Sequence, residues 1–470
     1  MTQRLFLLRV TAVVLTLAAS ASGPARQPAP GGDDWKYDVV YRKKGEPFKG
    51  LVQEQNADYV EITIVQRQPG RPTILMKEAV PRREVDRIEL LDPKDRDVLH
   101  KRLDTLRKER VLLAARLKLL DPGSKAVTDA SDGVSLKPMP WPPEPRRSAL
   151  GYQSTHFRLI SSAREEFAQL AAIELEQVYG AYARYLPPRT NAQPTTILLT
   201  ASFAEYQAFV RGQGQNFINP AFFDPAKNQV VCGSDLQRLC DDLEKVRDFH
   251  AKRQKELADE EADLKAAYKN KVPPALLDPI VNERERIKLA EKRNTDGYHQ
   301  ERLRLFRRLY HEAFHAYLNT FVYPPAEGEM PRWFNEGLAQ IFEKAIFEVG
   351  ELRIGHAEKE QVEAVRKALA HDTLPPVAEL LRSGPRQFLV AHTSEMQRAD
   401  RFYLASWGLA SYLTFERRVL GTKALDEYVR SLKRGTEPVE AFTTLVGQPL
   451  PQFEKDYLQY LRQLRPADSR

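Results

Sequence analysis

The sequence is poor in cysteine. It contains 470 residues, but only two of them are cysteines, Cys232 and Cys240. This pair makes a poor zinc site, because thiolate zinc sites need further cysteine or histidine ligands close by. In an exported protein the two thiols would either form a disulfide that closes a short loop or stay separate and buried. The sequence leaves both alternatives open.

Long apolar runs are also scarce. The one such run spans residues 5–21, follows Arg4 and ends on Ala19-Ser20-Ala21, which is typical of a secretory signal peptide at residues 1–21. Its apolar part is shorter than the roughly 20 residues that a membrane-spanning helix needs. An uncleaved membrane anchor is the alternative to a cleaved signal peptide. No later segment is apolar enough to cross a bilayer. We therefore expect export to the periplasm or the cell exterior, with no stable membrane span after cleavage.

Concentrated charge of one sign is missing as well. The net charge of +7 is spread over the chain, with basic runs at residues 101–116 and 302–308 and acidic residues interleaved elsewhere. Nucleic-acid binding needs a concentrated basic face or a recognition motif. The sequence has neither, so we expect no nucleic-acid partner. A hydrophobic content of 42% and a charged content of 29% are instead typical of a globular protein with solvated helices.

The chain length predicts two or three domains. Residues 22–34 are rich in proline and glycine, which predicts a flexible leader. Residues 35–93 alternate apolar and polar positions between turn signals, which predicts a small SH3-like or Sm-like β-barrel module. Residues 94–147 predict a helix and a proline-rich linker. Residues 148–470 are the predicted main domain, with a charged helical hairpin inserted at residues 237–300. The module and the hairpin are candidate sites for a protein partner.

The main domain contains the motif His311-Glu312-x-x-His315 on a predicted helix. Apolar residues mark one face of this helix at steps of three and four: Leu303, Phe306, Tyr310, Phe314 and Tyr317. Residues four apart lie one above the other on a helix, so His311 and His315 can both bind one metal ion. Glu312 is rotated by about 100° and can reach a water on that metal. The alternative is a surface helix with two solvated histidines.

A second predicted helix, at residues 331–343, carries a candidate third ligand, Glu336, for which a solvated helix carboxylate is the alternative. Glu336 lies 21 positions after His315, and Gly337 and Ala339 beside it allow close helix packing. Two imidazoles and one carboxylate leave the fourth zinc position for water, as a catalytic site requires. Two further polar residues share the helix face of Glu336: Gln340 and Glu343.

Together these motifs resemble a known clan. HExxH followed by Trp-Phe-Asn-Glu-Gly-Leu-Ala at residues 333–339 resembles the gluzincin (peptidase MA) clan of zinc metallopeptidases, in particular bacterial families of secreted peptidase MA-like proteins. The resemblance extends over residues 150–460. It implies an α+β fold with a thermolysin-like zincin domain, made of a small mixed sheet, active-site helices and a helical carboxy-terminal subdomain. It also implies one Zn²⁺ per chain, bound by His311, His315 and Glu336, with Glu312 as the general base.

The resemblance implies three further features of the site. A strand at residues 228–233 would be the edge strand that lines the cleft and pairs with extended substrate. Tyr403 would donate a hydrogen bond to the oxyanion, with His356 and His392 as alternative donors. A purely structural role in the core is the other interpretation of Tyr403. Gln340 stands near the position where many gluzincins have an aspartate or serine that orients a ligand histidine.

We therefore predict a secreted zinc metallopeptidase that hydrolyses peptide or protein substrates. Two alternatives remain. A non-catalytic envelope scaffold or binding protein would keep the metal only for structure, with a protein ligand in its fourth position. A cell-wall hydrolase would apply the same zinc chemistry to a different substrate.

Overall fold

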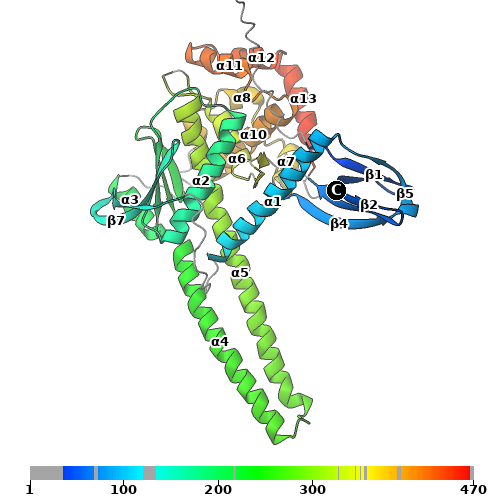
Figure 1. The fold of residues 1–470 in the computed structure, drawn as a ribbon. Helices are drawn as coiled ribbons and strands as arrows, with labels where there is room; N and C mark the ends of the chain where they lie inside the picture. The colour runs from blue at the N-terminus through cyan, green and yellow to red at the C-terminus, as the bar shows by residue number, and fades with distance from the viewer. Residues whose placement is uncertain are drawn as a thin grey trace, which may run out of the picture.

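The structure is a computed structural model of mixed α and β composition, with a β-rich amino-terminal module and a helical carboxy-terminal region (Figure 1). This confirms the predicted α+β class. The predicted signal peptide (residues 1–21) and leader (residues 22–34) lie outside the described residues. The residues that the structure describes are 35–67, 72–119, 134–214, 219–326, 328–344, 346–349, 351–353, 357–388 and 393–465.

The amino-terminal module is a five-stranded antiparallel sheet in the order β4-β3-β2-β1-β5. Its strands are β1 (Asp38–Arg42), β2 (Phe48–Gln55), β3 (Tyr59–Gln66), β4 (Ile74–Pro81) and β5 (Val85–Glu89). Among the described residues no ladder joins β4 to β5, so the sheet is open and the predicted closed barrel is wrong. Alternating residues predict strands, but closure depends on strand tilt and stagger, which a local pattern does not encode.

Helix α1 (Pro93–Leu119) packs across this sheet. Leu99 and Leu103 of the helix are buried against Trp35 and Leu51 of the module. A separate apolar cluster fills the interior of the sheet: Val40, Val52, Val60, Ile62, Ile64, Val80 and Val85. The module and α1 therefore form one folded unit, because the helix covers a face that would otherwise expose a tryptophan.

The main sheet has six strands in the order β10-β11-β9-β8-β7-β6. The strands are β6 (Lys137–Trp141), β7 (Glu144–Gln153), β8 (Phe157–Ser161), β9 (Thr195–Thr200), β10 (Ala221–Asp224) and β11 (Gln229–Gly233). Strands β8, β9 and β11 are parallel, and the remaining pairs are antiparallel. The three parallel strands form the centre of the sheet.

Helices cover both faces of these central strands. Helix α2 (Glu165–Tyr185) packs on the face of Leu159 and Ile197, whereas α3 (Phe203–Gly212) packs on the face of Ile160 and Leu198. Successive side chains of a strand point to opposite faces, so a run of consecutive apolar residues is needed for a sheet that is buried on both sides.

The predicted edge strand at residues 228–233 is not at an edge. Strand β11 pairs with β9 on one side and with β10 on the other, so β10 is the edge strand. The reason is a tight turn that folds β10 back onto β11, in which the carboxylate of Asp224 accepts a 3.0 Å hydrogen bond from the N–H of Ala226. The sequence showed this turn but not which strand would lie outermost.

The proline-rich segment before residue 147 is also different from the prediction. Its described part, residues 134–147, contains β6 and the start of β7 rather than a linker, so the main sheet begins before the predicted boundary at residue 148. Pro138 and Pro140 lie on β6, which is the other edge of the sheet. Proline has no N–H to donate, and an edge strand tolerates this because one of its sides has no neighbouring strand.

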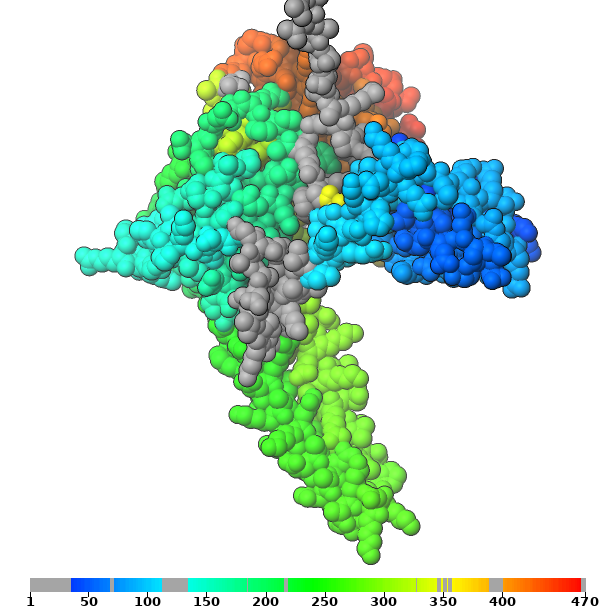
Figure 2. Space-filling view, in the orientation of Figure 1, coloured from blue at the N-terminus to red at the C-terminus, as the bar shows by residue number. Residues whose placement is uncertain are grey.

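Helices α4 (Leu236–Ala267) and α5 (Pro274–Tyr317) form an antiparallel arm that projects from the rest of the molecule (Figures 1 and 2). Leu257, Ile280 and Ile287 fill the interior of the arm, and Arg253 forms a 2.8 Å ion pair with Glu283. Helix α5 continues without a break from the arm into the main domain. No helix among the described residues is both long and apolar enough to cross a membrane.

The carboxy-terminal region begins with α6 (Arg332–Phe342) and a hairpin of β12 (Ile346–Glu348) and β13 (Glu351–Arg353). The remaining helices are α7 (Lys359–Ala370), α8 (Val377–Leu381), α9 (Pro385–Phe388), α10 (Thr393–Ser411), α11 (Lys423–Lys433), α12 (Pro438–Val446) and α13 (Leu450–Gln463). Helices α7, α8 and α9 contact α10, which lies against α6, and α12 packs against α8, α11 and α13.

The two cysteines are separate in the structure. Cys232 lies on β11 and Cys240 on α4, and both are buried thiols that are not joined in a disulfide. Burial raises the pKa of Cys232 to about 12, so its thiol stays protonated at neutral pH. Of the two alternatives that the sequence left open, the structure therefore has the buried thiols.

Candidate metal centre

The carboxy-terminal turns of α5 are fixed in the core of the main domain. Leu309, Ala313, Phe314 and Tyr317 have no exposed surface. Leu303, which the sequence pattern placed on the same face, is 44% exposed, so this face becomes buried only after that turn. The motif therefore lies on a rigid part of the helix, where its polar residues are held on the side toward α6.

Helix α6 approaches its neighbours closely because of one glycine. A Cβ at Gly337 would lie 2.3 Å from the carbonyl oxygen of Ser406 on α10 and 2.6 Å from the Cβ of Ala410. No side chain fits in that space, which confirms the close packing predicted beside Glu336. The neighbouring residue Glu336 is thereby held between α5 and α10 and is only 1% exposed.

The structure brings His311, His315 and Glu336 together. The Nε2 atom of His311 lies 3.3 Å from Oε2 of Glu336, and Nε2 of His315 lies 3.5 Å from Oε1. One ligand atom from each residue lies within 4.8 Å of the other two. The two imidazole rings are almost perpendicular, at 86°, so their nitrogens approach the common point from different directions.

Two further residues orient the imidazoles. The Nδ1 atom of His311 lies 2.8 Å from the Glu343 carboxylate, and Nδ1 of His315 lies 2.9 Å from the Asn335 amide oxygen. Both oxygens accept hydrogen bonds, so each histidine donates from Nδ1 and directs Nε2 toward the centre. Partners of this kind are typical of metal-binding histidines. Glu343 shares a helix face with Glu336 in the sequence, but nothing in the sequence pointed to Asn335.

The charges of the cluster are balanced inside the protein. Burial alone would raise the pKa of Glu336, but the charge of His315 and hydrogen bonds from both histidines hold it well below its usual value. Burial alone would lower the pKa of His311, but its hydrogen bonds with Glu336 and Glu343 raise it well above its usual value. Arg332 adds an ion pair to Glu336 at 2.6 Å. Glu336 is therefore held as a charged carboxylate, which is the form in which a carboxylate binds metal.

The donor set fits zinc. Two imidazole nitrogens and one carboxylate oxygen are the ligands of many catalytic zinc sites. Each nitrogen faces the centre, and each imidazole has an outer hydrogen-bond partner. Among the described residues, no fourth histidine, cysteine, aspartate or glutamate joins this group.

Glu312 is placed differently from the three ligand candidates. It follows His311 on α5 and is partly exposed, whereas Glu336 is buried. Its charge raises the pKa of Tyr403, which shows that the two side chains lie within electrostatic reach of one another. Glu312 is therefore partly exposed and within electrostatic reach of His311 and Tyr403.

Tyr403 also lies beside the cluster, on α10. Burial raises the pKa of its hydroxyl, and the charges of Glu336 and Glu312 act in the same direction, so the group remains a donor at neutral pH. The hydroxyl donates to the carbonyl oxygen of Phe388 at 3.4 Å, which is a weak contact. The amide of Gln340 donates to the backbone carbonyl of Tyr403 at 3.0 Å, so Gln340 links α6 to α10 and does not orient a histidine.

The alternative donors His356 and His392 lie outside the described residues. Of the five predicted site residues, the structure brings three to one point: His311, His315 and Glu336. Glu312 lies within electrostatic reach of His311, and Tyr403 lies within electrostatic reach of Glu336.

These features define a candidate metal-binding centre on a mixed α+β fold. A comparison with protein families shows that residues 307–439 are similar to a family described as "Protein of unknown function (DUF1570)". The matched segment contains both histidines, both glutamates and Tyr403. No significant match was found among curated proteins or among solved structures.

Proposed function

We propose that this protein is a zinc-dependent metallopeptidase of the gluzincin type. The observation that carries the proposal is the convergence of His311, His315 and Glu336, with Glu312 directly beside them. A metal held only for structure is normally enclosed by four protein ligands, whereas three ligands leave a position for water and substrate. The proposal includes one Zn²⁺ per chain, a peptide or protein substrate, and export through the amino-terminal signal peptide.

In such a site zinc supplies a Lewis acid that polarises the scissile carbonyl and lowers the pKa of a water molecule toward ~7. The chain supplies the proton transfers. Glu312 accepts a proton from the attacking water and delivers it to the leaving amine. Its partial exposure suits this role, because the carboxylate must meet both water and substrate.

Two further groups support the reaction. Tyr403 donates a hydrogen bond from its hydroxyl to the oxygen on which negative charge develops, exchanging the weak contact with Phe388 for a stronger one. Glu343 and Asn335 keep the two imidazoles in one orientation, so the site needs little rearrangement when metal binds.

The first test is the metal content of the exported chain, measured beside the variant His311→Ala. We expect about one zinc per parent chain and little in the variant, because three ligands bind zinc far better than two. Gln340→Ala changes a residue of α6 that is not a ligand candidate. It is the control and should keep its zinc. A parent protein without zinc, even after reconstitution, would contradict the proposal and favour the non-catalytic scaffold.

A further inference from the structure

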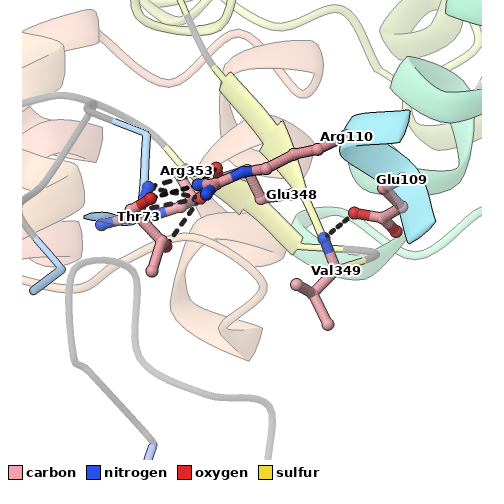
Figure 3. Close-up of polar contacts among 6 residues, drawn as sticks. All are labelled: Thr73, Glu109, Arg110, Glu348, Val349 and Arg353. Carbon is pink, nitrogen blue, oxygen red and sulfur yellow. Dashed lines mark hydrogen bonds and ion pairs between the residues drawn. The ribbon is translucent and has the colours of Figure 1, made fainter. Parts of the chain in front are cut away.

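A buried polar cluster joins the amino-terminal module to the β12–β13 hairpin (Figure 3). Thr73, which precedes β4, donates to the carboxylate of Glu348 from its backbone N–H at 2.9 Å and from its hydroxyl at 2.7 Å. Arg353 of the hairpin donates to Glu348 at 3.2 Å and to the Thr73 hydroxyl oxygen at 3.0 Å. Arg110 of α1 donates to Glu348 at 3.2 Å and also to the carbonyl oxygen of Thr73.

Three of the four members of the cluster are shielded from water, whereas the Arg110 side chain is 39% exposed. Thr73 is 1% exposed, Glu348 6% and Arg353 8%. Burial alone would raise the pKa of Glu348, but the hydrogen bonds from Thr73, together with Arg353 and Arg110, lower it. A buried charge is costly unless its partners are in place. The module therefore fits the hairpin in one orientation, in which every member of the cluster finds its partner.

The turn of the β12–β13 hairpin also contacts the module and α1. Val349 has a φ of +52°, a conformation that is unfavourable for a β-branched residue. Its N–H donates to the carboxylate of Glu109 on α1 at 2.6 Å, and its side chain packs on the apolar cluster around Trp35 and Leu99. Contacts from the module and α1 thus compensate for an unfavourable backbone conformation.

The hairpin leads directly to the metal centre. Glu343, which orients His311, lies five residues before Glu348 in the chain. Between these two glutamates, Lys344 forms a 2.7 Å ion pair with Glu358 at the start of α7. Glu358 in turn pairs with Arg307 of α5, one turn before His311. The segment after α6 is therefore held at one end by the metal centre and at the other by the module.

We infer that the amino-terminal module is a positioning element of the metal centre. Docked through Glu348, it fixes the hairpin, and the hairpin keeps Glu343 against His311. Glu348 is a positioning residue, because it acts on the metal only through Glu343. The inference rests on the proposed zinc site and adds its regulation: whatever undocks the module weakens metal binding.

The test measures zinc affinity of the full chain by competition with a chelator. Glu348→Gln keeps the size of the side chain but removes the charge, and Glu78→Gln makes the same change on the exposed part of β4. We expect Glu348→Gln to weaken zinc binding at least threefold and to change the visible absorption spectrum of the cobalt-substituted protein. Glu78→Gln should leave both unchanged. Removal of a group that is hydrogen-bonded directly to a metal ligand typically costs about 10–100-fold in metal affinity. A residue that acts only through such a group should cost less.

A double-variant cycle separates positioning from general damage to the fold. In the Glu343→Gln background, Glu348→Gln should cause no further loss of zinc affinity, because the residue through which it acts is already gone. Equal losses in both backgrounds would overturn the inference, and so would a loss below threefold in the single variant.

A second variant covers a failure of Glu348→Gln to fold. Thr73→Val keeps the shape of the side chain and the backbone N–H contact but removes the hydroxyl donor, and the same threefold loss is expected. A parent chain that binds no zinc would overturn the proposed function and this inference together. A parent that binds zinc, with unchanged affinity in Thr73→Val, would overturn the inference alone.

Discussion

Glu312 and Glu336 are the same residue type on two packed helices, but their surroundings differ. Glu336 is 1% exposed and is bonded by two histidines and Arg332. Glu312 is partly exposed. A carboxylate fixed among cations is suited to bind metal, and one with access to water is suited to move protons.

Substitution of Glu312 tests this division. Glu312→Gln should keep zinc, because the side chain is not among the ligands, and should lower peptide hydrolysis by roughly 10²–10⁴-fold, the usual contribution of a general base. Zinc content and cleavage of a peptide library by the zinc-loaded protein measure the two effects. Hydrolysis at the parent rate would contradict the assignment of Glu312.

Asn335 allows a second test at the residue scale. Asn335→Ala removes the acceptor for Nδ1 of His315 and should weaken zinc binding about 10-fold. Gln340→Ala, on the same helix, should have no such effect, because Gln340 bonds the backbone of Tyr403. Chelator competition measures both affinities, and equal values for the two variants would show that the Asn335 contact does not matter.

At the scale of elements, the contact between α6 and α10 decides where Glu336 lies. Gly337→Ala would place a methyl group 2.3 Å from the Ser406 oxygen, so one helix must move. We expect a loss of about 1–3 kcal/mol in unfolding free energy, as for other overpacked cores, together with weaker zinc binding.

Gly180→Ala on α2 is the control, because nothing lies within 4 Å of its added Cβ. Alanine favours helix, so this variant should be as stable as the parent or more stable. Chemical denaturation measures both changes. A Gly337→Ala protein of parent stability would mean that α6 and α10 have room to separate.

Sequence patterns predicted the elements of this protein better than their arrangement. The bounds of β3 and β9 follow from β-branched residues between turn signals, and the candidate metal-binding group follows from the spacing of His311, His315 and Glu336. The edge position of β10 and the open sheet of the module depend on contacts between distant segments. The partnership of Asn335 with His315 depends on how two helices cross, which neither helix encodes alone.

At the scale of the whole molecule, the stability that the docked module gains from Glu348 should depend on pH. The pKa of Glu348 is lower than the ordinary value of 4.5, so its charge stabilises the folded chain above that pH. This contribution is lost as the pH falls from 4.5 through the lowered pKa, because the unfolded chain takes up the proton first. The advantage of the parent over Glu348→Gln in unfolding free energy should therefore shrink under acid.

Urea denaturation of both proteins at neutral pH and at several values below 4.5 gives this difference directly. Glu78→Gln, which changes an exposed carboxylate, serves as the control and should track the parent throughout. A difference between parent and Glu348→Gln that stays constant with pH would show that the charge of Glu348 does not stabilise the docked module.

The arm has a mechanical consequence. Helix α5 is 44 residues long, and at about 1.5 Å per residue it extends over roughly 66 Å from the tip of the arm to its end just past the motif. Because both histidines lie on this one rod, a torque applied near its tip acts on the same rigid body that carries them. A load on the arm is therefore resisted where the helix is packed in the core, around the buried side chains of Phe314 and Tyr317.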